Sequence, residues 1–150
     1  MNKKEAPQIP NYAVKTEERI RWSDLDAAGI MYFGQYVRLF EIGETELFRL
    51  VGFPYTNAQF EELGVWMLRV NFHCDFHSPA HIDDLLTISC WPEAIGGASL
   101  RLRFAVQRDT ELLGDGSCTI VSVDKNVGKA VKLPEELRQK MESLIMRNQS

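Results

Sequence analysis

Apolar residues recur every three or four positions along residues 32–51, which is the spacing of one face of a helix. Gly43 lies on this apolar face, where a missing side chain predicts that the helix packs closely against a sheet. Gly52 and Pro54 are expected to end the helix. The predicted apolar side consists of Phe33, Tyr36, Val37, Phe40, Leu47, Leu50 and Val51, and the polar side includes Glu41, Glu44 and Arg49.

Five other segments alternate apolar and polar residues and are predicted to be strands. They cover residues 14–22, 66–76, 86–90, 100–106 and 118–123, with hairpin turns at 96–97 and 109–114. A short helical or irregular connection is expected at 55–63, and a helix from Pro134 to about Met146. One long helix followed by four successive antiparallel strands indicates an α+β domain.

Length and composition exclude several classes of protein and partner. A chain of 150 residues most simply forms one domain, here residues 13–150 after a flexible arm at 1–12. The net charge of −4 argues against a nucleic-acid partner. No signal peptide and no apolar run of membrane-spanning length are found, so no membrane is expected and the cytoplasm is the default location. Cys74, Cys90 and Cys118 have no metal-like spacing and are predicted to be reduced and buried.

The segment before the long helix carries the candidate chemistry. Asp24 and Asp26 lie in a loop in which Gly29 permits a tight turn. The first backbone N–H groups of the following helix have no helical acceptor, so they suit a developing oxyanion. A carboxylate beside them could attack an acyl carbon or activate a water molecule. By residue type and position alone, however, Asp26 fits better as a cap of the turn or helix.

A set of motifs along nearly the whole chain resembles the 4-hydroxybenzoyl-CoA thioesterase-like family. D-x-D-x-x-G-I-M-Y-F at 24–33 is followed by Tyr36 and F-E at 40–41. Further on come P-A at 79–80 with D-D at 83–84, then V-D-x-x-x-G-K at 123–129 and P-E-E-L at 134–137. The resemblance implies a hotdog fold, in which a curved antiparallel sheet of about five strands wraps one long helix. It also implies acyl-CoA thioester hydrolysis without a cofactor or metal, at sites between the subunits of a homodimer or homotetramer.

The resemblance also assigns the catalytic positions. Asp26 falls on the catalytic acid of the family, as nucleophile or general base, which reverses the capping interpretation. Gly29, Tyr32 and Phe33 are expected to form the oxyanion site through the start of the helix. Phe33 stands where several family members have His or Tyr, so a side-chain donor is missing here. Asp24 is expected only to support the loop, paired with Arg21.

Substrate contacts are predicted more broadly. Glu41 matches a common family position on the helix, whereas Glu44 replaces a frequent Arg; surface charge is the alternative interpretation of both. Trp66 and Met67, with Tyr32 and Phe60, are expected to line the acyl channel. Cations near the mouth would bind the CoA phosphates. The candidates are Arg101 and Lys129, with Arg103, Lys125 and Lys132.

Three histidines, His73, His77 and His81, share one strand parity. Strand residues four apart lie about 13 Å from each other, which disfavours a shared metal. Structural or interface roles are favoured instead, and His73 is a candidate contact to the acyl pocket of a neighbouring subunit. Two other functions stay open from the sequence, a hotdog enoyl-CoA hydratase or dehydratase and a non-catalytic acyl-thioester-binding protein.

Overall fold

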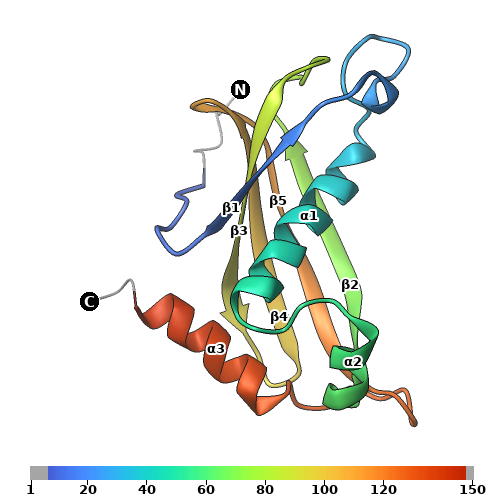
Figure 1. The fold of residues 1–150 in the computed structure, drawn as a ribbon, viewed down its shortest axis with the longest axis vertical. Helices are drawn as coiled ribbons and strands as arrows, with labels where there is room; N and C mark the ends of the chain where they lie inside the picture. Colours follow the sequence, from blue (N-terminus) through green and yellow to red (C-terminus); the bar gives the residue numbers. More distant parts are fainter. Residues whose placement is uncertain (1–6, 148–150) are drawn as a thin grey trace.

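The computed structural model describes residues 7–147 and shows one sheet crossed by one long helix (Figure 1). The sheet has five strands in the order β1-β3-β4-β5-β2, and all neighbouring strands are antiparallel. In chain order the elements are β1 (Val14–Arg19), the 3-10 helix η1 (Trp22–Asp24), α1 (Gln35–Leu50), α2 (Asn57–Leu63), β2 (Val65–Phe76), β3 (Leu85–Ile95), β4 (Ser99–Arg108), β5 (Glu111–Asp124) and α3 (Glu135–Met146).

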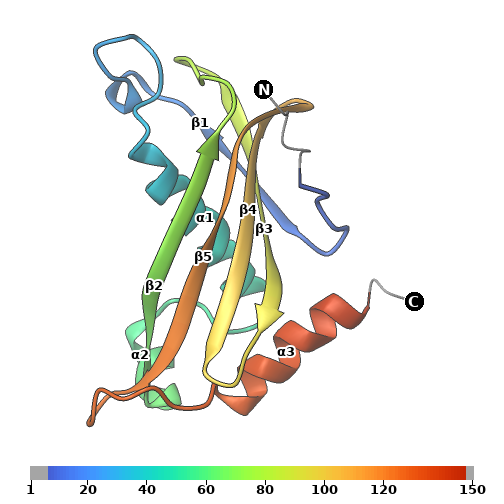
Figure 2. The same cartoon turned by 180° about the vertical axis from the view of Figure 1, so that it is seen from behind.

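Helix α1 lies along one face of the curved sheet, as Figures 1 and 2 show from opposite sides. Leu39, Phe40 and Leu47 of the helix are buried in one core with Ile88 and Phe104 of the sheet. The rings of Phe40 and Phe104 stack with centroids 4.3 Å apart. This arrangement confirms the predicted α+β hotdog architecture.

The close approach predicted at Gly43 is present. A Cβ atom at this position would lie 3.0 Å from Cγ2 of Ile88 and 3.2 Å from Cβ of Cys90. The glycine therefore lets the helix backbone contact β3 directly. The C-terminal helix α3 was also predicted correctly; Leu137 and Met141 join the core, and Arg138 donates hydrogen bonds to the carbonyls of the turn at residues 96–97.

The predicted sides of α1 are partly wrong. Phe33, Val37 and Leu50 were placed on the apolar side, but they are 63%, 55% and 58% exposed. Glu44 was placed on the polar side, yet it is buried at 4% exposure. The helix also begins at Gln35, not Tyr32, because residues 32–34 form a turn before it. The face that meets the sheet is thus rotated and includes a carboxylate.

Strand β2 departs from the predicted alternation through a β-bulge. Arg69 pairs with Ile120 and Asn71 with the adjacent Thr119, so Val70 is an extra residue. A bulge reverses which side chains face the core. Before it, the inward residues are Val65, Met67 and Arg69, and after it they are Phe72, Cys74 and Phe76. The prediction that Arg69 belongs to the polar face is therefore wrong.

Two predicted boundaries are also wrong. The first strand ends at Arg19, and Trp22 begins η1 with 80% of its surface exposed. The last turn covers only residues 109–110, and Gly114 lies within β5. A Cβ atom on Gly114 would lie 2.5 Å from the ring of Tyr36. This glycine serves helix packing and does not form a turn.

The chain termini and cysteines follow the predictions in part. Part of the predicted arm at 1–12 lies outside the described residues, while Tyr12 donates a hydrogen bond of 3.4 Å to the carbonyl of Pro92. Cys90 and Cys118 are buried as free thiols, but Cys74 is only half-buried. Within residues 7–147, no helix has the length and apolar character needed to span a membrane.

Candidate functional site

Backbone hydrogen bonds fold residues 26–30 into a tight loop that holds Asp26. The amide of Gly29 donates to the carbonyl of Asp26 at 3.0 Å, and the amide of Asp26 donates to the carbonyl of Ile30 at 2.9 Å. Gly29 adopts a φ of 78°, a left-handed conformation that favours glycine. Oδ1 of Asp26 accepts the amide of Ala28 at 2.8 Å, and the side chain stays exposed. The local capping role is therefore real, and it leaves the carboxylate accessible.

Asp24 anchors this loop to the rest of the molecule. It is only 2% exposed, and its carboxylate accepts the amide of Arg21 at 2.8 Å. The guanidinium of Arg38 on α1 lies 3.2 Å from Oδ2 of Asp24, and that of Arg21 lies 3.4 Å from Oδ1. The predicted pairing with Arg21 is confirmed. Asp24 thus ties the loop to α1 from a buried position.

The amides that precede α1 divide into engaged and free groups. Met31 donates to the carbonyl of Ala80 at 2.8 Å, and Tyr32 donates to the carbonyl of Asp24 at 2.9 Å. Among the residues that the structure describes, no acceptor is found for the amides of Phe33 and Gly34. These two are the donors of this turn that remain open to a ligand.

The Asp26 cavity, of about 460 Å³, lies between this loop and the end of β2. Asp26, Ile30, Met31 and Phe33 line it from the loop and Tyr36 from α1. Phe76 and residues 77–80 line it from the other side. The ring of Phe76 packs against Phe33 and Tyr36, with centroids 6.3 and 5.1 Å apart. An exposed carboxylate and an open amide-bearing turn therefore share one cavity with mostly apolar walls.

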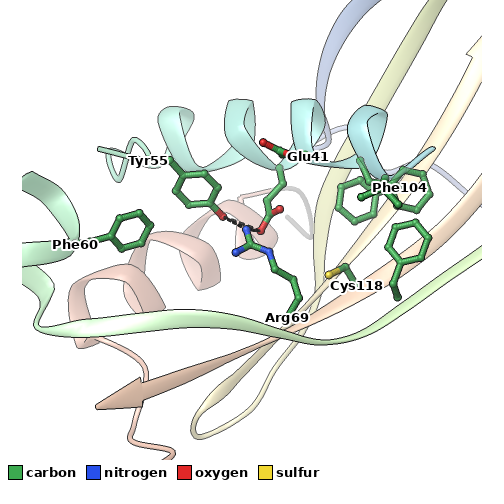
Figure 3. A pocket seen from close by; sticks show the side chains of 10 residues that line it. Glu41, Tyr55, Phe60, Arg69, Phe104 and Cys118 are labelled. Carbon is green, nitrogen blue, oxygen red and sulfur yellow. Dashed lines mark hydrogen bonds and ion pairs between the residues drawn. The ribbon is translucent and has the colours of Figure 1, made fainter. Parts of the chain in front are cut away.

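The Glu44 cavity, of about 690 Å³, lies further along α1, between the helix and the sheet (Figure 3). Its walls are mostly apolar and come from α1, from the segment that includes α2, and from the sheet. The lining residues are Val37, Phe40, Glu41, Glu44, Tyr55, Phe60, Arg69, Phe72, Phe104 and Cys118. Burial raises the pKa of Cys118 to about 11, so its thiol is protonated at neutral pH and contributes apolar surface.

Glu44, Tyr55 and Arg69 form a hydrogen-bonded cluster in this cavity, and Figure 3 shows Tyr55 and Arg69 turned toward each other. The Tyr55 hydroxyl donates to Oε1 of Glu44 at 2.7 Å, and the Arg69 guanidinium donates to the same oxygen at 2.5 Å. Burial raises the pKa of the Glu44 carboxyl, and the nearby Arg69 cation and the two hydrogen bonds offset this only in part. The cluster places a polar end inside an otherwise apolar cavity.

The sequence model of the thioesterase-like superfamily matches residues 20–141, which include both cavities. The chain belongs to the thioesterase-like superfamily. Haemophilus influenzae acyl-CoA thioesterase YbgC is 26% identical over 120 residues, covering 80% of this chain and 88% of that protein. A Synechococcus 1,4-dihydroxy-2-naphthoyl-CoA hydrolase is 27% identical over 128 residues, covering 83% and 86%. The crystal structure of a thioesterase superfamily protein from Jannaschia has the same fold, with a TM-score of 0.83 and 24% sequence identity. The match covers 92% of this chain and 96% of that protein.

The residues predicted as catalytic are brought together only in part. Asp26 and Phe33 line the Asp26 cavity, and Gly29 shapes the loop without lining it. Tyr32 also lies outside the lining, and its amide is already used by Asp24. Among the described residues, the amides of this turn without an acceptor are those of Phe33 and Gly34, and Phe33 also lines the Asp26 cavity.

The predicted substrate contacts are more scattered. Glu41 and Phe60 line the Glu44 cavity, whereas five other residues line neither cavity: Trp66, Met67, His73, Arg101 and Lys129. Arg101 pairs with Glu93 at 2.9 Å. Lys125 lies over the ring of Trp66 at 4.3 Å from its centroid. None of the five predicted phosphate-binding cations lines either cavity; these are Arg101, Arg103, Lys125, Lys129 and Lys132.

Each histidine pairs with a different carboxylate. His73 lies 3.1 Å from Asp75, and His81 lies 3.9 Å from Asp84. Nε2 of His77 lies 2.5 Å from Oδ1 of Asp115, whose other oxygen is 3.1 Å from Arg103. Within residues 7–147, no group of three or more potential ligand side chains gathers as a metal site.

Sequence reasoning missed the cluster of Glu44, Tyr55 and Arg69. One signal for it was present, because Glu44 follows Phe40 by four residues and precedes Leu47 by three. That spacing places it on the buried face of a helix. Arg69 carried no equivalent signal, since only the bulge at Val70 turns it inward.

Proposed function

We propose that the protein is an acyl-CoA thioesterase that hydrolyses a thioester to a carboxylate and free CoA in the Asp26 cavity. The observation that carries the proposal is the exposed carboxylate of Asp26 in the same cavity as Phe33, whose amide has no acceptor among the described residues. Membership of the thioesterase-like superfamily and the named activities of the relatives support it.

In the proposed reaction, the thioester carbonyl oxygen accepts hydrogen bonds from the amides of Phe33 and Gly34. The charge that develops on this oxygen is stabilised by donors already fixed by the fold, each contributing about 3 kcal/mol to the transition state. Asp26 either attacks the carbonyl carbon or removes a proton from an attacking water molecule. Collapse of the tetrahedral intermediate expels the CoA thiolate, and the residues need no metal or redox cofactor for these steps.

We also propose that two copies of the chain associate through β2. This strand spans 12 residues at the edge of the sheet, so one side of its backbone is unpaired. Trp66, Leu68 and Val70 expose 48%, 48% and 61% of their surface along it. Analytical ultracentrifugation should show a dimer or tetramer, and a monomer at micromolar concentration would contradict this.

A non-catalytic acyl-thioester-binding protein is the second candidate. Phe33 favours it, because a phenyl ring supplies no proton donor or acceptor at this position. A hydratase needs a histidine paired with an acid. The loop at residues 24–33 has no histidine, but His77 lines the Asp26 cavity with its Nε2 atom 2.5 Å from Oδ1 of Asp115, so this activity is tested as well. Conversion of an enoyl-CoA to the 3-hydroxyacyl-CoA with its thioester intact would identify a hydratase, and binding without thiol release would identify the binding protein.

The deciding experiment measures thiol release over a panel of acyl-CoA substrates with the purified protein and with Asp26→Asn. Asn preserves the size of the side chain, so folding should be unchanged while kcat falls by about a thousandfold or more, the range found when an essential catalytic group is removed. Asp109→Asn is the matched control, because Asp109 is an exposed turn residue outside both cavities. Equal turnover by Asp26→Asn and the control would refute the assignment.

Turnover in water enriched in heavy oxygen, with analysis of the protein itself, separates the two roles of Asp26. If Asp26 is the nucleophile, hydrolysis of the acyl-enzyme by attack at the acyl carbon puts the heavy atom in the product. A water molecule that Asp26 activates as a base puts the heavy atom in the product as well. The product therefore does not distinguish the two roles, whereas labelling of the protein does. Over repeated turnovers, attack of water on the Asp26 carbonyl would label its carboxylate, and trapping of an acylated Asp26 peptide by mass spectrometry would identify the nucleophile directly.

A further inference from the structure

The Glu44 cavity contains a carboxylate oxygen, Oε2 of Glu44, that accepts no hydrogen bond from the described residues. The Glu44 side chain is only 5% exposed, and both of its hydrogen bonds end on Oε1. No donor to Oε2 is found among the described residues. The Arg69 side chain beside it is 43% exposed and lines the cavity. A ligand in the cavity can therefore meet an unpaired carboxylate oxygen and an accessible guanidinium at the same end.

One stripe of α1 connects the two cavities. Phe33 lies in the turn before α1 and lines the Asp26 cavity. Val37, Glu41 and Glu44 follow along one face of the helix, at intervals of four and three residues, and line the Glu44 cavity. At 1.5 Å per residue, Glu44 is about 10 Å from Val37 along the helix, and Phe33 lies four residues before Val37. Phe33, Val37 and the facing Phe72 are 63%, 55% and 44% exposed, so apolar surface borders this path. An acyl group whose carbonyl meets the Phe33 amide needs a long apolar body to reach Glu44.

We propose that the Glu44 cavity binds the acyl group of a long thioester and that Glu44, Arg69 and Tyr55 recognise a hydroxyl group at its far end. The substrate class is an ω-hydroxylated acyl thioester of medium chain length. The proposal rests on the proposed function, because the position of the carbonyl is taken from the Asp26 cavity. The far hydroxyl would donate to Oε2 of Glu44 and accept from the exposed edge of Arg69.

The charges of the cavity explain why the far end of the acyl group should be neutral. Glu41 and Glu44 supply two carboxylates, and Arg69 supplies one guanidinium. A terminal carboxylate would be repelled by the excess negative charge and would leave Oε2 without a donor. A terminal methyl group would bury Oε2 unpaired, which penalises binding of the plain chain. A neutral hydroxyl group avoids the repulsion and donates a hydrogen bond to Oε2 of Glu44.

Three CoA thioesters of equal length test this selectivity: dodecanoyl-CoA, ω-hydroxydodecanoyl-CoA and the mono-CoA thioester of dodecanedioic acid. We expect kcat/KM to be about tenfold higher for the hydroxylated than for the plain substrate, the effect of one hydrogen bond to a charged group. The carboxylated substrate should be hydrolysed more slowly than the plain one. Equal kcat/KM for the hydroxylated and plain substrates would overturn the proposal.

Variants show whether the cluster is responsible. In Glu44→Gln and Tyr55→Phe, the ratio of kcat/KM for the hydroxylated over the plain substrate should fall toward one. Glu46→Gln is the matched control on the same helix, where Glu46 pairs with Arg49, and it should keep the ratio. A purely structural role would lower both rates together and leave the ratio unchanged, which contradicts recognition. If Glu44→Gln does not fold, Tyr55→Phe carries the test.

A binding measurement separates this proposal from the proposed function. Asp26→Asn is titrated by calorimetry with non-hydrolysable thioether analogues of dodecanoyl-CoA and ω-hydroxydodecanoyl-CoA. Tighter binding of the hydroxylated analogue, by about tenfold, supports the cavity assignment even if no thioester is hydrolysed. Equal affinities overturn the assignment even if thioesters are hydrolysed.

Discussion

The two cavities hold their carboxylates in opposite ways. Asp26 is fixed by a backbone turn and keeps its side chain exposed, with one hydrogen bond from the amide of Ala28. Glu44 is buried and is fixed by two side chains, Tyr55 and Arg69. A carboxylate positioned by its own backbone stays available for attack or proton transfer. A carboxylate buried against partners makes folding depend on those partners, and suits recognition.

The largest expected effect comes from removing the cation beside Glu44. Arg69→Leu leaves Glu44 buried with only Tyr55 as a partner, so we expect the free energy of unfolding to fall by about 3 kcal/mol. Urea denaturation at neutral pH measures this. The matched control is Arg49→Leu, whose pair with Glu46 is exposed and should contribute less than about 1 kcal/mol. Equal losses in the two variants would show that Glu44 is not held by Arg69.

Asp24 and Asp26 give the same contrast within one loop. Asp24→Ala removes a buried partner of Arg38 and of the Arg21 amide, so we expect a loss of about 2 kcal/mol in unfolding free energy. Asp26→Ala should cost less than about 1 kcal/mol, as is usual for an exposed residue. Thermal and urea unfolding of both variants, with thiol release measured in parallel, check this. Comparable stability of the two variants would remove the distinction between anchor and exposed carboxylate.

Tyr55→Phe tests the cluster with a smaller change. The phenyl ring still packs against Phe48 and Phe60, while the hydrogen bond from the hydroxyl to Glu44 and the one from Arg69 to the hydroxyl are lost. We expect a loss of about 1–2 kcal/mol, the usual contribution of a hydrogen bond to a charged group. Tyr12→Phe is the control, because its hydrogen bond of 3.4 Å is long. A loss no larger than that of Tyr12→Phe would indicate that Tyr55 contributes little to holding Glu44.

The smallest effect is the pH dependence of stability contributed by Glu44. Because the folded pKa is raised above the ordinary 4.5, folding favours the protonated carboxyl. This contribution is fully present below the unfolded pKa and is lost as pH rises through the folded pKa. Glu44→Gln lacks this dependence, so the stability of the wild type relative to Glu44→Gln should decline as pH rises from 4.5 through the folded pKa. Urea titrations at several pH values measure the difference, and an increase with pH would contradict the raised pKa.

Part of this comparison could be predicted from the sequence. The Asp26 loop lies in a contiguous segment, and its turn follows from Gly29 and the hydrogen bonds of neighbouring residues. The role of Asp26 came from family motifs, and it stays a proposal. The choice between the amides of Tyr32 and Phe33 could not be predicted, because the acceptor of Tyr32 depends on how the loop folds back onto Asp24.

The sequence by itself determined the long helix, the strand order along the chain and the close approach at Gly43, because periodicity and a missing side chain act locally. Only the tertiary structure decided that Arg69 turns inward to meet the buried Glu44. The physical reason is that a one-residue bulge changes the alternation of apolar and polar residues only slightly. It nevertheless exchanges the sheet faces on which the side chains before and after it lie. Which carboxylate is exposed and which is enclosed was therefore settled by pairing between strands and by packing of the helix on the sheet.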